Sequence, residues 1–441
     1  MSAIESASAG KHPYGPPDRW FILTLVSLNY FVLYLHRGVI GYIQPPLMAE
    51  LGLNDQQMGW LQPAFIVPYA LSQLFVAYLS DRFRRRTILI VSLSASVICL
   101  AAMGLAATYS QLIVLRMCLG VAQSASVPAI AGIMADSFTS KNRSTAVSVY
   151  LFSMGLAVWA AGTYGGKMAD IKSWSIPIGA ETLTLSGWRL SFLGFSLFGA
   201  LIVALLTFLL REPERTERQS GSGLGADSTT WMTTMSSVLT TPSFLVLALI
   251  FVLFSVVTNS REFWLARYFH DSFDMTLEEA GEFSTLWVQV AQFVGMLMGG
   301  IWADRWARSW QGGRGAMSAI GTAAWIPALL IIGTSDSMLH LKIAMMAFGW
   351  GLGVYVANLW TTTFDVVDPA ARSTATGMLN VFAFAPGFTG PLVGWLKDVG
   401  AIDDFGIMFA WFSVLAVANV VLFAVYIWIT LPRDFRAAGK E

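Results

Sequence analysis

The sequence YLSDRFRRR at residues 78–86 returns in altered form as IWADRWARS at residues 301–309. The carboxylates of the two copies, Asp81 and Asp304, stand 223 residues apart. Further landmarks recur at nearly the same interval: an arginine inside an apolar stretch, at Arg37 and Arg261, and the tetrapeptide RSTA, at residues 143–146 and 372–375. Because weak internal symmetry marks many transporter folds, this repeat predicts two halves built as parallel copies of one unit.

The composition predicts a membrane protein. Hydrophobic residues make up 55% of the chain and charged residues 12%, and the mean hydropathy is +0.61, outside the range of soluble domains. Apolar runs of about 20 residues, which suffice to cross about 30 Å of hydrocarbon, recur along the chain. We expect an all-α membrane protein with twelve transmembrane helices in two pseudo-symmetric six-helix bundles, at residues 20–43, 57–79, 87–107, 111–135, 143–168, 187–210, 243–268, 280–303, 315–334, 338–363, 372–396 and 404–430.

The longest break between apolar runs extends from Arg211 to Thr241, and it is first charged and then rich in glycine and serine. Such a composition predicts a flexible linker between the two bundles. Lysine and arginine concentrate on the side of the two chain ends, which predicts cytoplasmic termini in a bacterial inner membrane. The expected organisation is a tail at 1–19, a first bundle at 20–210, a linker at 211–242, a second bundle at 243–431 and a tail at 432–441.

Several classes of function find no support in the sequence. Cys99 and Cys118 both fall inside predicted helices, where a thiol is usually a packing residue. Nucleotide-binding glycine motifs, HExxH and histidine pairs at metal-ligand spacing do not occur. We therefore expect neither an enzyme nor a cofactor, a metal or a nucleic-acid partner. The predicted surroundings are the lipid bilayer, and the predicted assembly is a monomer.

Arg37 and Arg261 lie at nearly the same depth of the first and seventh predicted helices. A guanidinium stays charged at physiological pH and is costly in hydrocarbon, so an arginine in a spanning helix indicates a functional site. Two planar guanidiniums related by the repeat can together bind one phosphate, carboxylate or sulfonate group. The alternative for Arg261 is an internal ion pair with its neighbour Glu262.

The loop after the second helix resembles the signature loop of the major facilitator superfamily, G-x-L-x-D-R-x-G-R-R-x-x-L, and the likeness extends along the chain. Ala77 and Arg84 replace its two glycines. The resemblance implies gating charges at the ends of helices, here Asp81, Arg82, Arg85, Arg86, Arg116, Arg143, Asp304, Arg305 and Arg372. The alternatives are anchoring by the positive-inside rule and, for Arg116, snorkelling to the interface.

Within that superfamily, the segment NYFVLYLHRGVIGYIQPPLMAELGLNDQQMGWL at residues 29–61 resembles the anion:cation symporter group, and Spinster-type lysolipid carriers share much of its pattern. The symporter group is similar in carrying one arginine on helix 1 and another on helix 7, which Arg37 and Arg261 match. Proton-coupled members have acidic residues where this chain has His36 and Gln123. Symport with a proton through His36 or Glu262, exchange for a counter-anion, and uniport therefore all remain open.

Further substrate-binding candidates follow from helical spacing and from polar residues deep in apolar runs. Tyr30 and Tyr34 share a face with Arg37, and Trp264 shares one with Arg261. The deep polar candidates are Gln123, Tyr150, Gln292, Asn358 and Asn380. Each of these polar side chains has the alternative role of joining two helices by a hydrogen bond.

The sequence thus predicts a secondary active transporter of a small organic anion, such as a carboxylate, a sugar acid or an organophosphate. It works by alternating access, and paired arginines bind the substrate. One alternative is a Spinster-like carrier of a lysolipid or another amphipathic anion. Another, of a different class, is an anion sensor that has the same fold but does not transport.

Overall fold

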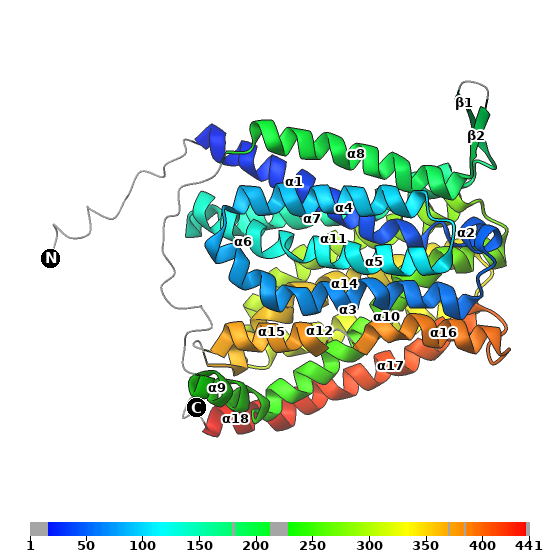
Figure 1. The fold of residues 1–441 in the computed structure, drawn as a ribbon. Helices are drawn as coiled ribbons and strands as arrows, with labels where there is room; N and C mark the ends of the chain where they lie inside the picture. The colour runs from blue at the N-terminus through cyan, green and yellow to red at the C-terminus, as the bar shows by residue number, and fades with distance from the viewer. Residues whose placement is uncertain (1–15, 179–180, 212–227, 369–370, 383–384, 438–441) are drawn as a thin grey trace.

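The computed structural model describes residues 16–178, 181–211, 228–368, 371–382 and 385–437. Long helices lie side by side in one bundle (Figure 1). One end of this bundle, where α1 begins and α18 ends, is called the terminal end below; the other carries a short β-hairpin and is called the hairpin end. The elements before the connecting helix are α1 (Pro16–Gly38), η1 (Val39–Gly41), α2 (Gln44–Leu51), α3 (Asp55–Arg82), α4 (Arg85–Gly104), α5 (Tyr109–Ser124), α6 (Ser126–Ser137), α7 (Ser140–Ala169), β1 (Trp174–Ile178), β2 (Glu181–Leu185) and α8 (Gly187–Leu209).

The connecting helix α9 (Ser228–Leu239) lies within the expected linker, so residues 228–239 of that linker are helical. Residues 212–227 lie outside the described part of the chain. The second half contains α10 (Pro242–Phe273), α11 (Leu277–Ala307), α12 (Gly313–Ala323), α13 (Trp325–Thr334), α14 (Met338–Val366), α15 (Arg372–Phe382), η3 (Ala385–Phe388), α16 (Thr389–Asp398), α17 (Phe405–Val425), the π-helical turn η4 (Tyr426–Thr430) and α18 (Leu431–Ala437).

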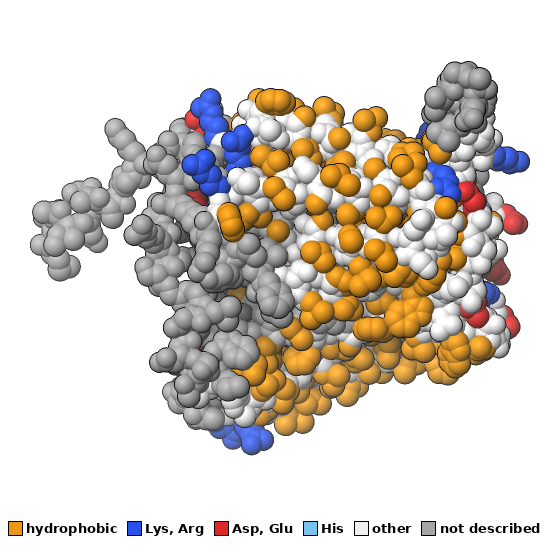
Figure 2. All heavy atoms as spheres, viewed as in Figure 1, with side chains coloured by type: hydrophobic (Ala, Val, Ile, Leu, Met, Phe, Trp, Pro, Cys, Tyr) orange, Lys and Arg blue, Asp and Glu red, His pale blue; other side chains and the backbone are white. Residues whose placement is uncertain are grey.

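The expected membrane-spanning architecture is confirmed. Within the described residues, 11 helical segments are long and apolar enough to cross a bilayer. The remaining expected span corresponds to α3, a helix of 28 residues. Within the described ranges, the one departure from an all-α fold is the antiparallel pair β1–β2, in which Trp174 pairs with Leu185 in the loop between α7 and α8. Figure 2 shows hydrophobic side chains across the middle of one face, with lysine and arginine near the terminal end.

Three predicted spans are divided among shorter helices in the described residues. The eleventh comprises α15, η3 and α16, and the other two break at an alanine. The fourth span breaks at Ala125, between α5 and α6, and the ninth breaks at Ala324, between α12 and α13. Pro128 and Pro327 follow these breaks by three residues. A proline has no N–H to donate and its ring crowds the carbonyl four residues earlier, so each break lies where the helical ladder is interrupted.

At the hairpin end, α7 packs closely against α11 of the other half. A Cβ placed on Gly162 would lie 2.6 Å from the carbonyl oxygen of Gly281, so glycine is what allows the two backbones to meet. One turn beyond Gly166, the carboxylate of Asp170 accepts the backbone N–H groups of Leu277 at 3.0 Å and Glu278 at 2.9 Å. Asp170 therefore caps the first turn of a helix in the opposite half.

The same arrangement joins α16 to α3. A Cβ on Gly390 would lie 2.8 Å from the carbonyl oxygen of Gly59. The carboxylate of Asp398 accepts the backbone N–H groups of Asp55 at 3.0 Å and Gln56 at 2.9 Å. We call the two contacts the aspartate latches; their glycines and aspartates, Gly162, Gly166 and Asp170 against Gly390, Gly394 and Asp398, recur at a constant spacing.

The latches and the ion pairs around them hold the two halves together at the hairpin end. Arg267 of α10 lies 3.2 Å from a carboxylate oxygen of Asp55 in α3. Near the terminal end, by contrast, Arg314 bonds Asp304 at 3.0 Å and Asp365 at 2.8 Å inside the second half. The structure is therefore a conformation in which the halves are closed against each other at the hairpin end.

Candidate functional site

Arg37 lies in the last turn of α1, inside a cage of aromatic rings. Its guanidinium carbon is 4.7 Å from the ring centroid of Tyr34, 4.8 Å from that of Phe65 and 4.6 Å from that of Tyr69. Cation–π contacts of this kind stabilise the charge without neutralising it. In the described part of the chain no carboxylate pairs with Arg37, and its Nε has no hydrogen-bond acceptor.

Arg116 on α5 supplies a second guanidinium beside the first. Its Nη2 donates to the carbonyl oxygen of Arg37 at 3.0 Å and its Nε to that of Leu61 at 3.1 Å. The same Phe65 ring lies 5.0 Å from its guanidinium carbon. With 3% of its surface exposed, Arg116 does not snorkel, and it joins α5 to α1 and α3 in the interior.

Arg261 on α10 is also buried, with 3% of its side chain exposed. Its Nη2 lies 3.4 Å from a carboxylate oxygen of Glu262, whose side chain is 53% exposed. The predicted alternative of a neighbouring ion pair is thus present, but the contact is long and the Nε of Arg261 has no acceptor. The guanidinium carbon also lies 5.5 Å from the ring centroid of Phe348.

The segment that follows α1, made of η1 and the start of α2, meets α10 directly. A Cβ on Gly41, one turn beyond Arg37, would lie 2.9 Å from the backbone oxygen of Glu262. The side-chain amide of Gln44 donates to the backbone oxygen of Phe263. Arg37 therefore lies about one turn before this contact and Arg261 directly beside it, in opposite halves of the molecule.

Three of the predicted tyrosines lie near Arg37. Tyr30 and Tyr34 are on the same helix, within two turns, and Tyr150 is on α7. The ring of Tyr30 stacks on that of Tyr150 with centroids 4.0 Å apart. The Tyr30 hydroxyl donates to the Tyr34 hydroxyl at 3.3 Å, and Tyr34 in turn contacts Arg37. The structure thus brings Tyr30, Tyr34 and Tyr150 together with the arginine, as their spacing predicts for the first two.

His36 and Gln123 belong to a hydrogen-bond chain inside the first half. Gln123 donates to Ser96 at 3.1 Å, the Ser96 hydroxyl lies 3.2 Å from Nδ1 of His36, and Nε2 of His36 lies 3.1 Å from the backbone oxygen of Phe195. A neutral imidazole that donates from Nε2 and accepts at Nδ1 satisfies every partner. Gln123 also donates to the backbone oxygen of Leu33 at 3.2 Å, so it joins helices.

Four other predicted substrate-binding residues lie in different surroundings. Trp264 is fully buried and stacks on Phe405 at 4.7 Å. Asn358 donates to backbone oxygens of its own helix and of α11, at 2.8 Å and 3.3 Å. Gln292 is buried on α11, and Asn380 is exposed on α15. A contact of these four with substrate stays a prediction.

Apart from Arg116, which lies in the interior, the predicted gating charges lie near the terminal end. The side chains of Asp81, Arg82 and Arg143 fall outside the described residues. Among the others, Arg85 pairs with Asp136, Arg86 donates to the Thr207 backbone, Asp304 pairs with Arg314, Arg305 is exposed, and Arg372 donates to the Phe364 backbone at 3.3 Å. Their role as gates stays a prediction.

Two further sets of paired residues, one at each end of the molecule, were not predicted from the sequence. At the terminal end, Asp136 and Asp365 receive Arg85 and Arg314, and the 229-residue offset of the RSTA repeat relates one pair to the other. At the hairpin end, the aspartate latches repeat the pattern glycine, glycine and aspartate at four-residue spacing. Both signals are present in the sequence as recurrences between the halves.

Two helical halves joined around buried, incompletely paired arginines define a multi-pass membrane transporter. The chain belongs to the Major Facilitator Superfamily, because the sequence profile of that family matches residues 26–391. Proteins of this superfamily are transporters and not enzymes. The sequence-based prediction of the superfamily is thereby confirmed.

Related proteins include carriers of organic anions and Spinster proteins. A protein of Cupriavidus necator named as a probable sulfoacetate transporter is 24% identical, with 87% of this chain and 89% of the relative covered. The cis,cis-muconate transport protein of Acinetobacter baylyi is 23% identical, with coverages of 82% and 84%. Protein spinster homolog 1 of Xenopus tropicalis is 22% identical, with coverages of 85% and 73%.

Among solved structures, a bacterial homologue of the human lysosomal transporter Spinster, in an inward-facing and unoccupied conformation, superposes with a TM-score of 0.76. It covers 97% of this chain and 99% of its own, at 19% sequence identity. At that identity the likeness shows a shared fold.

Proposed function

We propose that this protein is a secondary transporter that moves a small organic anion across the membrane by alternating access, with Arg37 and Arg261 as the binding groups. The observation that carries the proposal is Arg37, whose guanidinium lies in an aromatic cage with no carboxylate partner among the described residues. A charge is costly at membrane depth, so an arginine without a partner there indicates a ligand of opposite charge. Carboxylates, phosphates and sulfonates all fit the guanidinium fork.

The relatives support an anionic substrate. Two of those described above are named for the transport of sulfoacetate and of cis,cis-muconate, both of which are organic anions. Arg37 and Arg261 belong to opposite halves, whose helices meet beside them, so one small ligand can contact both halves. Movement of the halves about such a ligand is the basis of alternating access.

The closed hairpin end supplies one of the two states that alternating access needs. With both termini in the cytoplasm of a bacterium, as the lysine and arginine distribution predicts, the hairpin end faces outward and this state is closed on the outer side. The aspartate latches then have to separate for the anion to enter or leave on the outer side. The charged pairs at the terminal end rearrange in the opposite step.

Glu262 is the stronger of the two candidates for proton coupling. His36 uses both ring nitrogens inside the first half and is fully buried, so its protonation would disturb a satisfied network. Glu262 is half-exposed and contacts Arg261. An anion that binds Arg261 competes with this carboxylate for the guanidinium, so Glu262 is the group that substrate binding would disturb. Exchange for a counter-anion and uniport are the alternatives.

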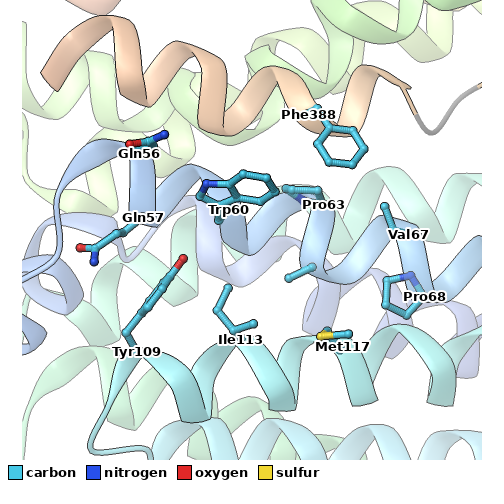
Figure 3. A pocket seen from close by; sticks show the side chains of 11 residues that line it. Gln56, Gln57, Trp60, Pro63, Val67, Pro68, Tyr109, Ile113, Met117 and Phe388 are labelled. Atoms are coloured by element: carbon cyan, nitrogen blue, oxygen red, sulfur yellow. The ribbon is translucent and has the colours of Figure 1, made fainter. Parts of the chain in front are cut away.

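A Spinster-like carrier of an amphipathic anion is the second candidate, and the observation in its favour is one apolar groove. This groove, of about 620 Å³, lies between α3, α5 and η3 near the hairpin end (Figure 3). Its lining is mainly apolar and includes Trp60, Pro68, Met117 and Phe388. However, the groove lies along one face of α3, whereas Phe65 and Tyr69 on another face contact Arg37. The groove therefore does not lead to the arginine, which favours the small anion.

Ligand binding to the purified protein tests the proposal. A ligand stabilises the state that it binds, so an excess of the right anion raises the thermal unfolding midpoint. We expect a carboxylate, sulfonate or phosphate to stabilise the parent, and we expect Arg37→Gln and Arg261→Gln to lose the shift. Lys342→Gln is the matched control, because Lys342 is half-buried at the hairpin end, where it contacts Trp287. Equal shifts in all four proteins would contradict the assignment.

A further inference from the structure

We infer that the transported substrate is a dianion, with two separate acidic groups, one bound at Arg37 and the other at Arg261. The inference rests on the proposed function and adds the charge of the substrate to it. Its basis is the balance of ionic groups around the two arginines, together with the placement of those arginines in opposite halves of the molecule.

Three guanidiniums and one carboxylate lie around this site in the described part of the chain. Arg37 and Arg116 lie against the same Phe65 ring, and Nη2 of Arg116 donates to the backbone of Arg37. Arg261 has the carboxylate of Glu262 at 3.4 Å. Two positive charges therefore remain without a counter-charge.

Neighbouring groups do not supply the missing negative charge. His36 is adjacent in sequence, but its hydrogen bonds suit a neutral imidazole. The rings around Arg37 are those of tyrosine and phenylalanine, which are neutral at physiological pH. Backbone oxygens accept two N–H groups of Arg116 and thereby orient its charge without cancelling it.

The need for neutralisation is greatest when the site is closed at both ends. Water screens unpaired guanidiniums while one end is open, but an occluded state removes that solvent. A buried charge without a partner is strongly unfavourable in a medium of low dielectric constant. A substrate with two negative charges leaves the occluded site neutral, whereas a monoanion leaves one guanidinium uncompensated.

The two arginines also have separate donors for two acidic groups. Among the residues that the structure describes, the Nε atoms of Arg37 on α1 and of Arg261 on α10 both lack an acceptor. One acidic group on each arginine satisfies both donors and links the two halves through the ligand. A single small acidic group can accept hydrogen bonds only from the N–H donors within its reach.

Matched ligand pairs test this inference on the full-length protein in lipid nanodiscs. The probes are succinate, hexanedioate and sulfoacetate, each compared with its carboxamide analogue, which has nearly the same shape and one negative charge fewer. Dissociation constants are measured by calorimetry at about pH 8, where every acidic group of the probes is ionised. We expect at least one dianion to bind at least about tenfold more tightly than its amide, a difference of about 1.4 kcal/mol.

Charge variants link the preference to the site. Arg261→Gln removes one positive charge and should weaken the binding of the dianion more than that of its amide, so that the affinity ratio, measured at high ligand concentration, falls toward one. Glu262→Gln removes the opposing carboxylate and should raise the ratio, so the test stands even if Arg261→Gln fails to fold. Lys342→Gln has the same change in net charge as Arg261→Gln at a distant place and should leave the ratio unchanged.

The outcomes separate this inference from the proposed function. If amides bind as tightly as dianions while Arg37→Gln and Arg261→Gln still abolish binding, the protein is an anion carrier and the dianion inference is wrong. If the ratio is unchanged in both Arg261→Gln and Glu262→Gln, the inference is also overturned. If no anion of a broad panel binds, the proposed function fails with it.

Discussion

At the scale of single residues, the buried arginines differ in their hydrogen bonding and therefore in their roles. Arg116 donates to two backbone oxygens, so most of its hydrogen bonding is structural. Arg37 and Arg261 make fewer bonds, and each keeps an Nε without an acceptor. The sequence could predict Arg37 and Arg261 as a pair because an intramembrane arginine is rare. It could not predict that Arg116 turns inward, because that depends on the packing of α5 against α1 and α3.

Glu50 provides a prediction about pH. It accepts Nε1 of Trp188 at 2.6 Å and Nε of Arg189 at 2.9 Å, which fastens α2 to α8. Partial burial alone would raise the pKa of Glu50, but the hydrogen bonds from Ser186, Trp188 and Arg189 outweigh it and leave the pKa below its ordinary value. A carboxyl with a lowered folded-state pKa contributes stability above its unfolded pKa and loses that contribution as the pH falls.

We therefore expect the unfolding midpoint of the parent to fall relative to that of Glu50→Gln as the pH is lowered below about 5. The difference between the two proteins isolates Glu50 from other carboxylates, which titrate in both. Thermal unfolding at a series of pH values between neutrality and about 4 measures it. A midpoint difference that does not change with pH would show that the Glu50 contact contributes no pH-dependent stability.

At the scale of elements, close backbone contacts determine where the two halves join. The aspartate latches combine glycine contacts with a carboxylate that caps the opposite helix. Asp170 and Asp398 each bond two N–H groups at a helix start, where the helix dipole favours negative charge. Each latch consists of glycine backbones in its inner part and of ionic groups at its edge. It can therefore separate without exposing large side chains.

Gly162→Ala tests the latch between α7 and α11. The added Cβ would lie 2.6 Å from the Gly281 oxygen, so the helices must move apart. We expect the hairpin-closed state to lose about 1–3 kcal/mol, and the hairpin-open population to rise about fivefold or more. Gly300→Ala on α11 is the matched control, because its Cβ would meet no atom within 4 Å.

The population is measured by pulsed electron spin resonance between labels at Lys172 and Asp336, two exposed positions at the hairpin end in opposite halves. Cys99 and Cys118 are first replaced by serine so that only these two positions carry labels. A longer distance in Gly162→Ala and an unchanged one in Gly300→Ala support the latch. Identical distance distributions in both variants and the parent would show that α7 and α11 do not limit opening.

The elements also show what sequence can and cannot predict. Spans such as α8 and α10 begin and end within a few residues of their expected positions, because an apolar run bounded by charges specifies them. The β1–β2 hairpin and α9 lie in polar segments whose composition does not distinguish turn from helix or strand. The latch pattern is visible twice in the sequence, but its partner helices depend on tertiary packing.

At the scale of the whole molecule, the two halves repeat each other in sequence but differ in the surroundings of their arginines. The two halves repeat the same ion pairs and capping contacts at both ends, yet the arginine environments differ. Arg37 has rings and no carboxylate partner among the described residues, and Arg261 has Glu262. One half therefore offers a permanent positive charge and the other a charge whose partner can be displaced. On the proposed function, we expect one half to hold the anion while the other responds to it.

The central claim is that Arg37 and Arg261 bind the transported anion, and counterflow in proteoliposomes tests it most directly. Vesicles loaded with an excess of the stabilising anion are diluted into a trace of the same anion in labelled form. Our account predicts transient accumulation of label by the parent and by Lys342→Gln, and none by Arg37→Gln or Arg261→Gln. Accumulation at the parent's rate by both arginine variants would show that the anion crosses without these arginines and would contradict the account.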